Sequence, residues 1–81
     1  MATIRDVLDV CRDISVMITF FGATPEALND FERRKECVRN AIMEEQNISD
    51  PAEAAKLPGT TILGKKAEAA LESLKELVPR K

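Results

Sequence analysis

Apolar side chains recur every three or four positions between residues 3 and 21, which is the spacing of an amphipathic helix. The repeating positions are Ile4, Val7, Leu8, Cys11, Ile14, Ile18 and Phe21. Thr3 and Asp6 have the spacing of a capping box, and Gly22 suits the position just after a helix end. Residues 14–21 are also rich in strand-forming side chains. The uninterrupted three-four spacing nevertheless predicts one helix over residues 3–21.

A second helix is predicted over residues 25–46. Thr24, Pro25 and Glu26 are favoured at the N-cap, the first position and the first turn of a helix. Its apolar stripe consists of Leu28, Phe31, Val38, Ala41 and Ile42. The connection from the first helix is so short that the two helices are expected to form an antiparallel hairpin. The expected neighbours across the hairpin are Ile18 with Leu28, Ile14 with Phe31, and Ile4 with Ile42.

After a break at residues 47–50, the pattern predicts a short helix and then a third long one. The sequence Asp50-Pro51-Ala52-Glu53 is a capping box with proline at the first helical position, and it predicts a short helix over residues 51–57. Apolar positions at three-four spacing then predict a helix over residues 61–78.

These elements predict a single all-α domain over residues 1–81, built as a helical hairpin plus a third helix in a three-helix or open bundle. A chain of 81 residues buries only about 60% of its unfolded surface, so its core alone provides marginal stability. Oligomerisation is one usual remedy, and we expect most simply a symmetric dimer through the Val16/Phe20 side of the first helix.

The outer face of the first helix changes character along its length. It begins with Arg5, Asp6, Asp9, Arg12 and Asp13, and it continues with Val16 and Phe20. Two interpretations of this apolar half are open: the third helix or the linker covers it, or it meets a second copy or a target protein. The second interpretation predicts an interface that comprises Val10, Val16, Met17, Phe20 and Phe21.

The charge balance argues against a protein that coats nucleic acid. The chain has 12 basic and 14 acidic residues, a net charge of −2, and three phenylalanines with no tryptophan or tyrosine. A basic surplus and stacking aromatic side chains are typical of nucleic-acid binders. Nucleic-acid binding through the second helix is therefore the third-ranked hypothesis.

Two basic clusters raise an alternative, the binding of a small anionic ligand such as a nucleotide. Their members are Arg33, Arg34 and Arg39 in the second helix, and Lys65 and Lys66 after Gly64. The segment Gly59–Lys66 approaches the phosphate-loop pattern, but Lys66 replaces the hydroxyl residue and no strand precedes it. Local ion pairs on a solvated helix face are the competing interpretation. Arg34 borders the apolar stripe, so its guanidinium must reach solvent or meet a partner.

Several chemistries are not expected. Without histidine the commonest acid–base group is missing, which predicts a protein that is not an enzyme, and no metal or other cofactor is expected. Cys11 and Cys37 are expected to be reduced, and a disulfide is disfavoured because Cys37 lies off the apolar stripe. The apolar run over residues 14–21 is shorter than the ~20 residues that cross a membrane, and the N-terminal sequence is unlike a signal peptide. We expect a cytoplasmic protein.

Taken together, the sequence predicts a small non-enzymatic helical regulator or inhibitor that binds a protein, or itself, through an exposed apolar patch. Small size and simple architecture are typical of accessory proteins of phages or mobile elements.

Overall fold

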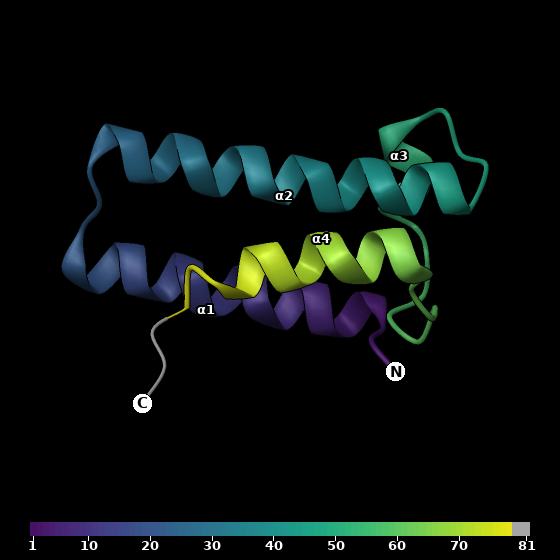
Figure 1. The fold of residues 1–81 in the computed structure, drawn as a ribbon, viewed down its shortest axis with the longest axis horizontal. Helices are drawn as coiled ribbons and strands as arrows, with labels where there is room; N and C mark the ends of the chain where they lie inside the picture. The colour runs from purple at the N-terminus through teal and green to yellow at the C-terminus, as the bar shows by residue number, and fades with distance from the viewer. Residues whose placement is uncertain (79–81) are drawn as a thin grey trace.

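The computed structural model describes residues 1–78, which form four helices (Figure 1). They are α1 (Ile4–Phe21), α2 (Pro25–Glu45), α3 (Pro51–Ala54) and α4 (Lys65–Lys75). The prediction of an all-α fold with a helical hairpin and a third long helix is confirmed. Among the described residues, no helix combines the length and the apolarity needed to cross a membrane.

The helix α4 packs against both arms of the hairpin. The arms α1 and α2 run antiparallel, and α4 lies along them with its chain direction opposite to that of α2 (Figure 1). The closest packing in the molecule is that of α2 on α4, whereas the backbones of α1 and α2 scarcely approach each other. The space between the arms is therefore covered by α4 on one face and is open on the other.

The ends of α1 follow from local sequence and from one tertiary contact. The backbone N–H of Thr3 donates to the Asp6 carboxylate at 2.8 Å, as expected for a capping box. The backbone N–H groups of Ile4 and Arg5 donate to the carbonyls of Thr61 and Gly59, so the preceding loop of α4 satisfies two amides that a helix start leaves free. At the other end Gly22 adopts φ 74°, a left-handed value that glycine accepts without strain.

The start of α4 is later than the sequence predicts. Residues 61–64, predicted as the first turn of this helix, are extended instead, because residues 61–63 pair with the chain before α1. Thr3 and Ile62 form an antiparallel bridge, and the N–H of Leu63 donates to the carbonyl of Ala2 at 2.9 Å. The end of α4 at Lys75 is also earlier than predicted, and α3 ends at Ala54 instead of near residue 57. The third long helix, α4, is thus only 11 residues long.

The core lies where all three long helices overlap. Leu71 and Leu74 of α4 and Val38 of α2 are its most completely buried large side chains. The remaining core members are Ile4, Val7, Ile14, Phe31, Ala41, Ile42, Leu63 and Ala67. Each long helix contributes the face that the apolar spacing predicts.

Three predicted stripe residues are not in the core. Phe21, Leu8 and Leu28 are 85%, 61% and 39% exposed. Leu8 faces the side of the hairpin that α4 does not cover. For Phe21 and Leu28, near the Gly22 turn, the reason is a difference in helix length: at 1.5 Å per residue, α4 spans about 16 Å, against about 27 Å for α1 and about 31 Å for α2. The helix α4 therefore ends before it reaches the Gly22 turn, and it lies on only one face of the hairpin.

Candidate functional site

Glu45 of α2 caps the N-terminus of α4. Its two carboxylate oxygens accept hydrogen bonds from the backbone N–H groups of Gly64, at 2.9 Å, and Ala67, at 3.1 Å. A carboxylate in this position also opposes the positive end of the helix dipole. A Cβ atom at Gly64 would lie 2.5 Å from the Glu45 carboxylate, so the close approach of this cap requires glycine there. The anion-binding end of α4 is therefore occupied by the protein itself.

Arg34 of α2 holds the opposite end of α4. Its guanidinium donates to the backbone carbonyl of Ser73 at 2.7 Å and to Asp30 at 3.1 Å, and it lies 3.6 Å from Glu76. The expectation that Arg34 either reaches solvent or meets a partner is resolved within the chain: the partner is the last turn of α4. A cation at this end complements the helix dipole. The helix α2 thus binds α4 at both ends.

The remaining basic residues of the two predicted clusters lie among acidic neighbours. Arg33 pairs with Asp30 at 2.5 Å, and Arg39 pairs with Glu36 at 3.6 Å. Lys66 pairs with Glu44 at 2.5 Å across the helices, and Lys65 is exposed at the start of α4. Arg34 and the lysine pair stand at opposite ends of α4, about 15 Å apart at 1.5 Å per residue. The structure does not bring the two clusters together into one anion site.

The surface beside the Gly22 turn is both apolar and uncharged. Phe20 and Val16 are 77% and 46% exposed, Phe21 is exposed as stated above, and Met17 is half-buried. Although 32% of the chain is charged, residues 14–25 contain no charged side chain. We call Val16, Met17, Phe20 and Phe21 the turn patch. Val10, which the sequence places with these residues, is half-buried against the core one helical turn or more away.

A hollow of about 400 Å³ adjoins the turn patch. It opens between α1 and α2 beyond the end of α4, with Met17 and Phe21 on its α1 side, Ala27 and Phe31 on its α2 side, and Leu77 where α4 has ended. Its lining is almost entirely apolar. The hollow exists because α4 is shorter than the arms it packs on, a consequence that the predicted helix over residues 61–78 did not anticipate.

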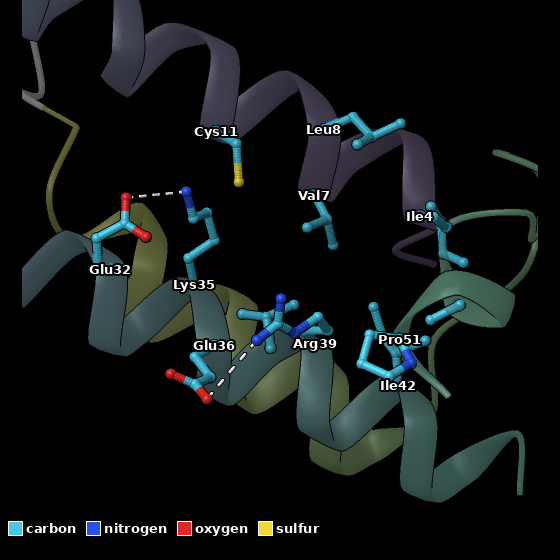
Figure 2. Close-up of a pocket in the computed structure, with 13 residues that line it drawn as sticks. Ile4, Val7, Leu8, Cys11, Glu32, Lys35, Glu36, Arg39, Ile42 and Pro51 are labelled. Carbon is cyan, nitrogen blue, oxygen red and sulfur yellow. Dashed lines mark hydrogen bonds and ion pairs between the residues drawn. The ribbon is translucent and has the colours of Figure 1, made fainter. Parts of the chain in front are cut away.

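A second groove of about 420 Å³ lies between α1 and α2 on the face opposite α4 (Figure 2). Val7, Leu8 and Cys11 line it from α1, and Val38 and Ile42 line it from α2. Charged side chains of α2 form its rim: Glu32, Lys35, Glu36 and Arg39. Sequence reasoning missed this groove, because it assumed that the two arms pack directly on each other. Leu8, which the sequence places in the apolar stripe, lines this groove and is exposed because the arms do not pack directly on each other.

The cysteines belong to different environments. Cys11 points into the groove (Figure 2) and is half-buried, and this burial raises the pKa of its thiol although the nearby Lys35 opposes the change. A raised pKa leaves the thiol protonated and weakly nucleophilic at neutral pH. Cys37 is exposed on α2, and both cysteines are free.

Comparisons of the chain with protein-family models, curated proteins and solved structures give no match. Within residues 1–78, no group of three or more cysteine and carboxylate side chains is arranged to hold a metal ion. The case for function therefore depends on the turn patch, its hollow and the groove.

Proposed function

We propose that this protein is a small non-enzymatic binding module that acts in the cytoplasm, and that its turn patch receives an apolar segment of a partner protein. The observation that carries the proposal is the uncovered end of the hairpin, where Phe20 and Phe21 are exposed beside an apolar hollow. Exposed apolar surface that is clustered on a small domain is typical of association sites.

The composition of the turn patch supports a protein partner. Aromatic side chains and methionine are enriched in protein interfaces and supply much of their binding energy, whereas charged residues are depleted at the interface centre. Phe20, Phe21 and Met17 belong to the enriched types, and residues 14–25 carry no charged side chain that would have to be desolvated. The adjoining hollow has space for a large apolar side chain of the partner.

The mode of action that follows is occupation of the partner's surface. A compact module with no chemistry of its own regulates a partner by covering an apolar surface that the partner needs for another contact. We therefore propose the role of a regulator or inhibitor, which suits an accessory protein of a phage or mobile element.

The test is capture of partners by three immobilised proteins: the natural chain, Phe20→Asp and Thr19→Asp. Both variants add one negative charge to the last turn of α1, but Thr19 is an exposed polar residue outside the turn patch. We expect a partner that the natural chain and Thr19→Asp capture and that Phe20→Asp loses. The purified partner should then bind Phe20→Asp at least about tenfold more weakly.

Circular dichroism should show the same helix content for all three proteins. The proposal is wrong if no captured protein distinguishes Phe20→Asp from Thr19→Asp.

A further inference from the structure

The face opposite α4 is the broad side of the molecule that no element of the described chain covers. Its centre is the groove between α1 and α2, closed at one end by Pro51, Ala54 and Ala55 in and beside α3. Figure 2 shows Val7 and Cys11 pointing into the groove from α1, opposite Lys35 and Arg39 on α2. The exposed Leu8 stands at its α1 edge. A helix laid in this groove would complete a four-helix arrangement.

The charges on the α2 rim alternate in sign in the order Glu32, Lys35, Glu36 and Arg39. Within the chain Lys35 pairs with Glu32 at 3.1 Å and Arg39 pairs with Glu36 at 3.6 Å (Figure 2). Exposed pairs of this kind are weak, so the same charges are available to a second copy. If a second α2 lies antiparallel, with a two-fold axis between positions 35 and 36, then Glu32 faces Arg39 and Lys35 faces Glu36 in both directions. The same axis sets Leu28 opposite Met43, both apolar. All four charges meet an opposite charge, which is the self-complementarity that an isologous interface requires.

This alignment is specific. A shift of one helix by three residues sets Lys35 against Arg39 or Glu32 against Glu36, both like-charge pairs. A shift by four residues leaves only one pair of opposite charges facing each other. The order of charges along α2 therefore distinguishes one antiparallel register from its neighbours.

We propose that a second copy of this chain docks on this face, with α2 of each copy lying antiparallel in the groove between α1 and α2 of the other. The exposed Leu8 and the half-buried Cys11 supply apolar contacts, and the charges of α2 set the register. Charge pairs across an interface contribute more to specificity than to affinity.

The face opposite α4 is one of the two broad sides of the molecule, whose longest extents are 36 and 25 Å (Figure 1). Standard interfaces bury about 800 Å² on each partner, so the dimer requires that most of this side is covered. The dimer face is distinct from the turn patch, so this inference does not depend on the proposed function.

The test is sedimentation equilibrium over a series of protein concentrations for four chains: the natural one, Lys35→Glu, Lys35→Glu/Glu36→Lys and Arg33→Glu. Lys35→Glu sets a carboxylate against Glu36 of the second copy, and we expect the dimer to weaken at least about tenfold. The double variant exchanges the two charges and should restore most of the affinity. Arg33→Glu makes the same charge change outside the groove and should leave the dimer intact.

A second readout uses the two cysteines. Alkylation of Cys11 should slow as the protein concentration rises, because the dimer covers the groove, whereas alkylation of Cys37 should not change.

The proposal is overturned if the natural chain stays monomeric at about millimolar concentration, because its dimerisation free energy would then be weaker than about 4 kcal/mol. It is equally overturned if the charge exchange fails to restore a weakened dimer, or if Phe20→Asp dissociates the dimer while Lys35→Glu does not. Loss of partner capture by Phe20→Asp would leave the dimer unaffected, so the two proposals fail separately.

Discussion

The two ends of the hairpin differ in what covers them. At the end near Glu45, α4 lies along α2, its first amides bind the Glu45 carboxylate, and the core residues Leu63 and Ala67 are buried. At the end near Gly22, α4 has already stopped, and Phe20 and Phe21 are exposed. The apolar stripe of α1 runs through both ends, although the outer face of α1 is charged at the first end and apolar at the second. The stripe is covered at only one end because α4 is shorter than the arms it packs on.

This contrast shows that apolar content and burial are separate properties of a helix. The apolar stripe of α1 continues to Phe21, yet the fold uses it only as far as α4 extends. The unused part is then available to another molecule, which the covered part is not. The following predictions test this division, beginning with the covered end.

The largest loss of stability is expected for Leu71→Ala. Leu71 is fully buried between the helices, and removal of such a side chain leaves a cavity that costs about 2–5 kcal/mol. Equilibrium unfolding in urea, followed by circular dichroism, measures the change. A loss below about 1 kcal/mol would show that the covered end is not the main source of stability.

A smaller loss is expected for Glu45→Ala. The variant removes two hydrogen bonds to the N-terminal amides of α4, and loss of a helix cap costs about 1 kcal/mol. Glu44→Ala is the matched control, because Glu44 forms only an exposed ion pair with Lys66 and such pairs contribute about 0–1 kcal/mol. Equal effects of the two substitutions in urea unfolding would contradict the assigned role of Glu45.

The Arg34 contact predicts a similar comparison at the other end of α4. Arg34→Lys keeps the charge but cannot donate simultaneously to Asp30 and the Ser73 carbonyl in the fixed geometry of a guanidinium. We expect a loss of about 1 kcal/mol and faster hydrogen exchange in the last turn of α4. Unchanged exchange rates in that turn would exclude Arg34 as its anchor.

The smallest effect on stability is the pH dependence due to Asp30. Hydrogen bonds from Arg34 and Arg33 lower the pKa of Asp30 below its ordinary value of 3.8. Its contribution to stability is therefore present above pH 3.8 and is lost as the pH falls through the lowered pKa of the folded state. Asp30→Asn should remove that component from the stability profile measured below pH 4, and an unaltered profile would contradict it.

The helix boundaries that depend on neighbouring residues were predictable from the sequence. Thr3, Gly22, Thr24 and Asp50 mark ends that local hydrogen bonding and backbone preference determine. The need of Arg34 for a partner or for solvent was also predictable, since it borders an apolar stripe. These inferences require only the chain within a few residues of each position.

The start of α4 was not predictable in this way. Residues 61–63 continue an apolar spacing, but they pair instead with residues 2–4, a contact that spans nearly 60 positions and leaves no local signal. The exposure of Phe21 and the hollow beside it have a different origin, the early end of α4 at Lys75. The local spacing was sufficient to place Val16 and Phe20 on an outer face, while the hollow beside the Gly22 turn could not be foreseen.

The central claim is that the turn patch does not stabilise the folded chain. Urea unfolding of Phe20→Ser/Phe21→Ser, compared with the natural chain at a concentration where both are monomeric, tests it most directly. Because both phenylalanines are exposed, we predict a change in the free energy of unfolding within about 0.5 kcal/mol. A loss of about 2 kcal/mol or more, as for a core residue, would show that the fold itself buries the patch, and would contradict the claim.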